Sequence, residues 1–354
     1  MIAPLRILAL LGVLALALPA AAETSSWIME STEAPKPRPG RPVKIAPNEK
    51  FSKVPIYNEG ETKESGLSKL LVKPSGDEAA YIAFDQGQYF TARKLAEEAA
   101  QRGDPQAHTL LGRLYAEGLG VSKDLQAAAQ WYEKGDRLGD IQASFALGVL
   151  YAEGRGVKKD RAKAADLFEK AARTGHPLAN YNLGLLFLKG DGKPQNPYRA
   201  AMHIRYAAEK GIAVAQYDLA GLYQNGEGVT PNALDAARWL SKAAEQGMAE
   251  AQFDYAVVLL RGLGLTKDEP KAVPYLRAAA QKGLAAAQNR LAYVYAEGVG
   301  VKKSPQEAAK WRLIAQAGGL KDDALDAFVG KLPQQQQVAA QQAASEWRER
   351  AGLF

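Results

Sequence analysis

Apolar side chains recur along residues 103–318 with the spacing of helices that each bury one face. If each copy is counted from a glycine that returns every 36 residues, position 5 is always alanine, and positions 9 and 12 are aliphatic or aromatic. Offsets of four and three place these positions on one side of a helix. The period gives six copies, which begin at Gly103, Gly139, Gly175, Gly211, Gly247 and Gly283. A fixed period of this length indicates a repeat architecture.

A second helix is expected in the latter half of every copy. Glycine occupies positions 16 and 18 of each copy, as in Gly118 and Gly120, and it marks a sharp reversal because glycine adopts the left-handed backbone that ends a helix. Position 22 then holds a residue whose side chain caps a helix start. These caps are Asp124, Asp160, Asn196, Asn232, Asp268 and Ser304. Each copy is therefore predicted to be an antiparallel pair of helices.

One such pair cannot bury its apolar face alone, so neighbouring pairs must stack. The sequence predicts an all-α, right-handed αα-superhelical solenoid of six repeats with end caps. The expected segments are a signal peptide at 1–22, a tail at 23–76, a capping pair at 77–102, repeats at 103–318 and capping helices at 319–354, about fourteen helices in all. Pro333 is expected to start the last helix, and Ala340, Ala344 and Trp347 to share its inward face. A bend is expected near 270–274, where Pro274 lies inside a second helix.

The fourth copy carries a recognisable resemblance. The segment "AQYDLAGLYQNGEGVTPNALDAARWLSKAAEQG", residues 215–247, resembles a Sel1-like repeat, which is related to the tetratricopeptide repeat. The matching features are the alanine, the Leu-Tyr pair, the Gly-x-Gly-Val loop, the capping position and Ala-x-x-Trp followed by Lys-Ala-Ala. The resemblance implies binding rather than catalysis, because similar proteins act as scaffolds or adaptors in bacterial envelopes.

The first 22 residues, "MIAPLRILALLGVLALALPAAA", have the form of a secretory signal peptide. Arg6 precedes an apolar run, and Ala20 and Ala22 are small residues placed for cleavage before Glu23. A membrane anchor is the alternative, but the apolar run is short for a span of about 20 residues. The expected location is the periplasm or the exterior, with no stable membrane insertion after cleavage. The chain has no cysteine, so no disulfide contributes.

Residues 23–76 are rich in proline and lysine and show no sustained periodicity, which is typical of a disordered or extended tail. Residues 35–54 hold six Lys/Arg and one Glu, within a chain of formal net charge +6. This tail is either a spacer or a basic patch for anionic envelope polymers or lipid head groups. The balanced charge of the rest argues against a nucleic-acid partner.

A binding surface is expected on the first helices, at positions 4, 8, 11 and 15, which vary between copies. We call this stripe the first-helix face. In stacked helical pairs the first helices line the concave side, which such folds use for binding. The alternative is a merely solvated face. The predicted partner-binding residues are Leu110, Arg113, Val149, Leu178, Asn182, Leu185, Asp218, Glu250, Asp254, Val257, Arg261, Arg290 and Tyr293.

Catalytic chemistry is not marked by any motif. The Gly-x-Gly loops follow helices rather than strands, which argues against a phosphate loop. His108, His176 and His203 do not have metal-ligand spacing, and His203 is expected to replace a core tryptophan. No metal, cofactor or catalytic residue is assigned. The leading hypothesis is a non-catalytic, regulatory scaffold for a protein or peptide. The alternatives are a structural envelope component that binds peptidoglycan or serves exopolysaccharide machinery, and an enzyme with an unmarked site.

Overall fold

The computed structural model describes residues 76–352, and the predicted signal peptide and almost all of the tail lie outside them. The described residues form helices and no strand, which confirms the predicted all-α class. They belong to two compact units, divided between His176 and Pro177. We call residues 76–176 the N-terminal unit and residues 177–352 the C-terminal unit.

The N-terminal unit consists of three helical hairpins. Its helices are α1 (Gly76–Asp85), α2 (Tyr89–Gln101), α3 (Pro105–Glu117), α4 (Leu125–Arg137), α5 (Ile141–Glu153) and α6 (Arg161–Arg173). Each helix packs against the next one in the chain, so every hairpin also packs against its neighbour. The core consists largely of alanine and leucine, with Phe84 and Tyr132 as larger members.

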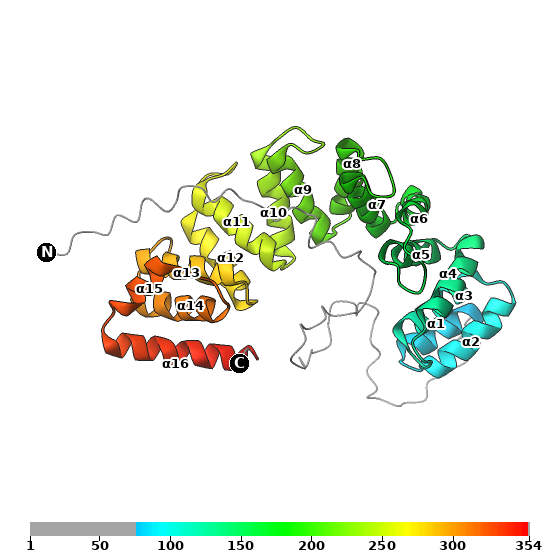
Figure 1. Ribbon diagram of the computed structural model, residues 1–354, viewed down its shortest axis with the longest axis horizontal. Coiled ribbons are helices and arrows are strands. Elements are labelled where there is room, and N and C mark those ends of the chain that lie inside the picture. The colour runs from blue at the N-terminus through cyan, green and yellow to red at the C-terminus, as the bar shows by residue number, and fades with distance from the viewer. Residues whose placement is uncertain (1–75, 353–354) are drawn as a thin grey trace, which may run out of the picture. The chain divides into compact units, whose positions relative to one another are not determined.

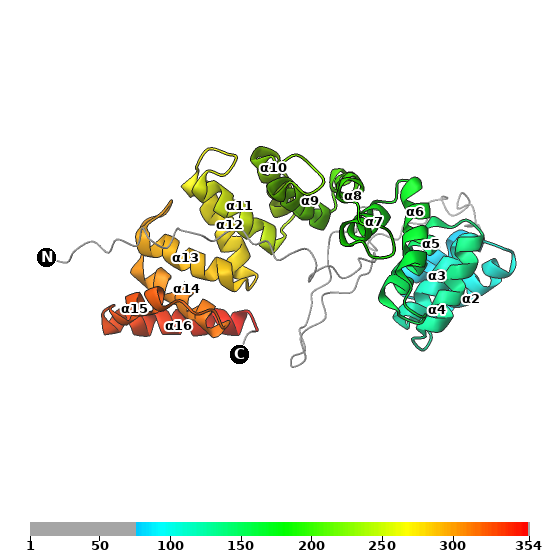
Figure 2. The same ribbon diagram turned by 45° about the horizontal axis from the view of Figure 1, so that its top comes forward.

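The C-terminal unit continues the same pattern through four hairpins and ends with two further helices. Its helices are α7 (Pro177–Lys189), α8 (Pro197–Glu209), α9 (Ala213–Asn225), α10 (Ala233–Glu245), α11 (Ala249–Arg261), α12 (Glu269–Gln281), α13 (Ala285–Glu297), α14 (Pro305–Ala317), α15 (Asp323–Gly330) and α16 (Gln334–Arg350). In Figures 1 and 2 the two helices of a hairpin, such as α9 and α10, run alongside each other. The described residues thus contain sixteen helices, two more than expected, because both end helices add to the seven hairpins.

The predicted caps are confirmed at all six second helices. Asp124 accepts hydrogen bonds from the backbone amides of Gln126 and Ala127, and Asp160, Asn196, Asn232, Asp268 and Ser304 make equivalent bonds. The first glycine of the loop also behaves as predicted. Gly118 ends α3 with φ +76° and donates its N–H to the carbonyl of Leu114.

The second glycine of the loop has a different role. A Cβ atom on Gly120 would lie 2.8 Å from the backbone carbon of Tyr89, in the first turn of α2. A Cβ atom on Gly228 or Gly264 would come closer still to the first turn of α8 or α10, which lies in the preceding hairpin. Only a residue without a side chain permits this approach, so the second glycine serves the packing of one hairpin on the next.

Position 10 of the first helix shows volume compensation against the second helix. A Cβ on Gly112 or Gly148 would overlap the rings of Tyr132 and Phe168, which occupy position 30 of the same copies. Where position 10 is alanine, as in the fourth and fifth copies, position 30 is Leu240 or Leu276. In these four copies a larger side chain at position 30 thus accompanies a smaller one at position 10, as close packing favours.

The C-terminal end is closed by α15 and α16. Pro333 immediately precedes α16, as predicted. Ala340 and Ala344 are buried, and the ring of Trp347 meets Trp311 edge to face at 5.7 Å between ring centroids, so the predicted inward face is confirmed. Helix α12 runs without interruption through Pro274, and the bend expected there stays a prediction.

Arg312 at position 30 of the sixth copy is the largest fully buried side chain among the described residues. Its guanidinium donates to both carboxylate oxygens of Asp326, at 2.5 and 2.8 Å, and to Asn289 and the carbonyl of Leu320. A buried charge is tolerated only when it is paired in this way. Arg312 therefore fixes α15 against α13 and α14.

Candidate functional site on the first helices

The first-helix face combines buried and accessible residues. Seven of the predicted binding residues have buried side chains, namely Leu110, Val149, Leu178, Asn182, Leu185, Asp254 and Val257. Among these, Val149 and Asn182 have no exposed surface. The apolar row expected in the second and third copies is therefore not an accessible surface, and sequence reasoning could not separate these positions from solvent-facing ones.

The remaining predicted residues are accessible. Glu250 and Arg261 on α11 are exposed, and Arg113, Asp218, Arg290 and Tyr293 are partly exposed. All of these are polar. In the N-terminal unit, Arg113 forms an ion pair with Glu117 and lies over the Phe84 ring at 4.6 Å from its centroid. The other accessible members of the face lie in the C-terminal unit.

Hydrogen bonds between tyrosine and aspartate link successive first helices of the C-terminal unit. The Tyr181 hydroxyl on α7 donates to Asp218 on α9 at 2.8 Å, and the Tyr217 hydroxyl on α9 donates to Asp254 on α11 at 2.7 Å. In both pairs the tyrosine occupies position 7 of one copy and the aspartate position 8 of the next. We call them the Tyr–Asp pairs. The sequence did not indicate these bonds, because position 7 lies outside the stripe formed by positions 4, 8, 11 and 15.

Burial raises the pKa of both aspartates. The pKa of Asp218 rises from 3.8 to about 6 because burial outweighs the hydrogen bond from Tyr181 and the positive charge of Lys189. The pKa of Asp254 also rises to about 6, because burial and the negative charge of Glu250 outweigh the bond from Tyr217. Both carboxyls thus titrate near neutral pH, unlike ordinary aspartates.

A different group of charges lies toward α13. Burial, together with the positive charge of Arg261, lowers the pKa of Arg290, while Tyr293 and Asp322 act in the opposite direction. The Tyr293 hydroxyl donates to Asp322 at 3.0 Å, and Asn289 donates to the same carboxylate at 2.7 Å. Although burial alone would raise it, these bonds and the Leu325 amide hold the pKa of Asp322 below its ordinary value. The accessible charges of the face are thus acidic at Asp218 and Glu250 and basic at Arg261 and Arg290.

The three histidines have structural partners. The rings of His108 and Trp131, of His176 and Phe145, and of His203 and Phe187 pack together, with centroids 5.6, 4.4 and 5.8 Å apart. Residues 76–352 contain no cluster of three His, Cys, Asp or Glu side chains suited to a metal ion. Within the same range, no helix is both long enough and apolar enough to span a membrane.

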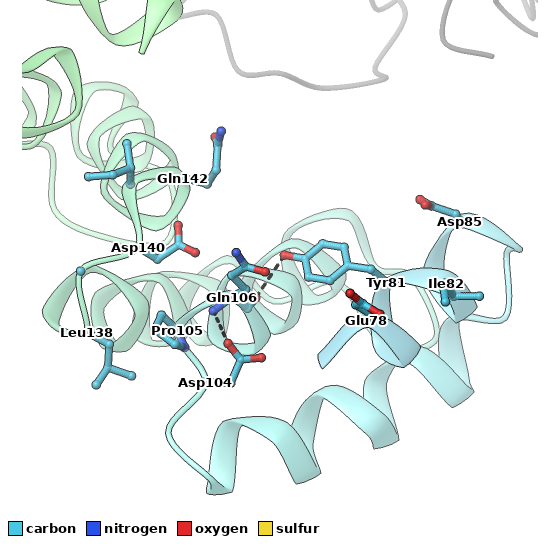
Figure 3. Close-up of a pocket in the computed structure, with 12 residues that line it drawn as sticks. Glu78, Tyr81, Ile82, Asp85, Asp104, Pro105, Gln106, Leu138, Asp140 and Gln142 are labelled. Atoms are coloured by element: carbon cyan, nitrogen blue, oxygen red, sulfur yellow. Dashed lines mark hydrogen bonds between the residues drawn. The ribbon is translucent and has the colours of Figure 1, made fainter. Parts of the chain in front are cut away.

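A hollow of about 990 Å³ lies in the N-terminal unit, between α1 and the starts of α3 and α5. Glu78, Asp85, Asp104 and Asp140 line it, together with Tyr81, whose hydroxyl donates to the carbonyl of Gln106 at 3.2 Å (Figure 3). We call it the acidic hollow. The sequence did not reveal it, although Asp104 and Asp140 share position 2 of their copies and so recur at the same place.

A second, smaller hollow of about 500 Å³ lies in the C-terminal unit. Trp311 and Trp347 form part of it, with Arg277, Lys310 and Arg350 at its walls. Lys310 is paired with Glu307, and Arg277 donates to the Tyr295 hydroxyl at 2.9 Å. These cations are therefore engaged within the protein.

Comparisons with known proteins agree with this architecture. The Sel1 repeat model matches residues 105–140, 141–176, 177–212, 213–248, 249–284 and 285–312. A Sel1 repeat protein from Oxalobacter formigenes is similar in structure, with 30% sequence identity and a TM-score of 0.60 over 68% of this chain and 96% of that protein. No curated protein matches the chain.

The antigen c5321 is also similar, with 28% identity and a TM-score of 0.52 over 77% of this chain and 68% of that protein. It is described as a protective antigen, present in uropathogenic Escherichia coli strains, that displays an SLR fold. Sel1 repeats indicate a helical scaffold for protein interaction. Six consecutive matches that cover more than half of its residues show that this chain belongs to the Sel1 repeat family.

Proposed function

We propose that this protein is an exported, non-catalytic scaffold of the bacterial cell envelope that binds a partner protein through the first-helix face of its C-terminal unit. The observation that carries the proposal is the change of charge along that face. Asp218 and Glu250 stand at one end, and Arg261 and Arg290 at the other, all at least partly accessible. Packing does not require charged residues at these positions, because other copies place apolar or uncharged ones there.

Such a face distinguishes partners by the order in which their charged groups follow one another. A partner segment with basic groups opposite Asp218 and Glu250, and acidic groups opposite Arg261 and Arg290, is attracted in one orientation and repelled in the other. Complementary charges chiefly increase selectivity and the association rate. The apolar residues predicted for this face are buried. Affinity must therefore come from polar contacts and from partly exposed side chains such as Tyr293.

Photo-crosslinking in the native host tests this proposal. A photoreactive amino acid placed at Glu250 or at Arg261 should capture the same partner from intact cells. The matched control uses Arg238 and Lys242, which are exposed on the second helix α10. The proposal fails if the partner crosslinks equally well at the control positions, or only there.

The captured partner then allows a quantitative test. We expect the double variant Glu250→Lys/Arg261→Glu to weaken binding of the purified partner by roughly ten- to hundredfold, since charge reversal replaces attraction by repulsion. Isothermal titration calorimetry measures the affinity, and circular dichroism verifies that the helices remain. Unchanged affinity in a folded variant would contradict a role for this face.

A further inference from the structure

The acidic hollow of the N-terminal unit carries a negative charge that its own lining does not neutralise. Four carboxylates line it, and no lysine or arginine is among the described residues of the lining. Glu78 and Asp85 are exposed, and Asp104 and Asp140 are partly exposed. Asp104 and Asp140 each cap a helix, α3 and α5, through one carboxylate oxygen, and the Oδ2 atom of Asp104 is buried without a hydrogen-bond partner. The hollow therefore favours a cationic occupant.

Three of these carboxylates also act electrostatically on the same group in the hollow, the hydroxyl of Tyr81. The pKa of the Tyr81 hydroxyl rises to about 12, chiefly through burial and then through the negative charges of Asp140, Asp104 and Asp85, while the positive charge of Arg113 acts in the opposite direction. These residues come from α1, from the start of α3 and from the start of α5 (Figure 3). Their charges thus combine in one place, although they are far apart in the sequence.

Apolar surface lies beside these charges. Ile82 on α1 and Leu138 at the end of α4 line the hollow with 43% and 48% of their surface exposed. They belong to a set of seven exposed large hydrophobic side chains in the described part of the chain. A hollow with carboxylates and two apolar contacts suits a peptide in which basic and apolar residues alternate, rather than a free metal ion.

The chain itself contains such a segment. Residues 36–53 include Lys36, Arg38, Arg41, Lys44, Lys50 and Lys53, with Val43, Ile45 and Phe51 between them. This segment precedes α1, which forms one wall of the hollow, and a linker of residues 54–75 separates the two. The 23 residue steps from Lys53 to Gly76 can span at most roughly 75–80 Å, so chain length does not prevent contact.

We propose that the acidic hollow is the docking site for the chain's own basic segment, residues 36–53. Lysine and arginine side chains pair with Glu78, Asp85 and Asp140, and apolar residues of the segment cover Ile82 and Leu138. Tethering makes this contact intramolecular, at an effective concentration on the order of millimolar, so a weak interaction is sufficient. The contact is electrostatic and therefore weakens as salt screens the charges.

Carbodiimide crosslinking tests the contact in the full mature chain. This reagent joins lysine amines directly to carboxylates. We expect crosslinks from Lys44, Lys50 or Lys53 to Glu78, Asp85 or Asp140 in mass spectra. A mixture of ¹⁴N- and ¹⁵N-labelled protein shows whether each link lies within one chain. Links found solely between two chains would overturn the proposal.

Spin labels provide the quantitative measurement, because a protein without cysteine accepts labels only where cysteines are introduced. The variant Ser52→Cys/Arg137→Cys places one label in the basic segment and one at the residue next to Leu138, which lines the hollow. Adding Glu78→Gln/Asp85→Asn should reduce the fraction of molecules in which the two labels lie close together by roughly three- to tenfold. A salt concentration of about 1 M NaCl should have the same effect. Both residues are exposed, so the fold is expected to persist, and circular dichroism verifies it.

The matched control is Glu97→Gln/Glu98→Gln on α2, which removes two carboxylates outside the hollow and should leave the short distances unchanged. Equal loss in this control would overturn the proposal, because any acidic surface would then serve. Labels that stay far apart in the parent protein, while an unrelated basic peptide binds the hollow in trans, would also overturn it and assign the hollow to a separate basic partner.

Discussion

The second loop glycine illustrates how a single residue controls packing between hairpins. Gly228 has φ +70°, and a Cβ atom there would overlap the backbone carbonyl of Pro197 at the start of α8. Gly211 also has a positive φ, +91°, but nothing lies within 4 Å of the corresponding Cβ position. The two glycines therefore share the backbone requirement and differ only in the space around them.

This difference predicts unequal effects of alanine. Gly211→Ala should lower the free energy of unfolding by roughly 1–2 kcal/mol, the cost of a left-handed backbone for an L-residue. Gly228→Ala should cost about 1–3 kcal/mol more, because the new methyl group forces a backbone shift. Urea unfolding followed by circular dichroism measures both. Equal losses would show that α8 can move away at no cost.

The Tyr–Asp pairs act at the scale of the element, since each joins one first helix to the next. Asp254 is buried between α9 and α11 and accepts a hydrogen bond from Tyr217. Its pKa in the folded chain is about 6, against 3.8 for the unperturbed group. Between these two values the folded state binds a proton that the unfolded state has released. The contribution of Asp254 to the free energy of unfolding therefore increases as the pH falls from about 6 towards 3.8.

Asp254→Asn should accordingly stabilise the protein at pH 7.5, by on the order of 1–2 kcal/mol, because the amide still accepts the Tyr217 hydrogen bond without a buried charge. The advantage over the unsubstituted chain should be complete above about pH 6 and vanish below the unfolded pKa of 3.8. Urea unfolding of both proteins from pH 4 to pH 8 isolates this residue from all other carboxylates. A difference that does not vary with pH would contradict a raised pKa.

At the scale of the whole molecule, the Sel1 repeats occupy most of the chain, and residues before 76 carry the predicted signal peptide and the basic segment. Export and the proposed docking contact are linked by the order of these segments. If cleavage occurs before Glu23, the mature chain still retains every basic residue of 36–53.

The predicted cleavage is directly measurable. In the native host, the mature protein should begin at Glu23 and appear in the periplasmic fraction or the medium. Ala20→Leu/Ala22→Leu should leave the precursor uncleaved, because the processing site requires small residues. Amino-terminal sequencing and cell fractionation provide the readouts. A cytoplasmic protein that retains residues 1–22 would contradict the proposal of export.

Local features of the fold could be predicted from the sequence because each depends on a few neighbouring residues. The caps at Asp124 and Asp160, the left-handed Gly118 and the inward face of α16 are of this kind. His203, predicted to replace a core residue, is only partly buried, although its ring packs on Phe187. The constant period then extended these local predictions to the whole array.

The candidate site was less predictable because it depends on contacts between copies. Variation at position 11 suggested exposure, yet Val149 and Leu185 are buried, since a buried position may vary when its neighbours compensate. The Tyr181–Asp218 bond joins residues 37 apart, which only the register of two stacked hairpins brings together. The acidic hollow likewise depends on where the atypical helix α1 packs, and no repeat position specifies this.

The contact of the second loop glycine with the preceding hairpin has a consequence for how such genes can change. Within each unit, a repeat such as the fourth carries both halves of the junction, the glycine that enters and the helix start that receives it. Duplication or loss of a complete 36-residue unit therefore preserves every junction, whereas a gain or loss of one codon inside the loop displaces the glycine from its receiving helix. Lineages should accordingly differ by whole repeats far more often than by fragments of them.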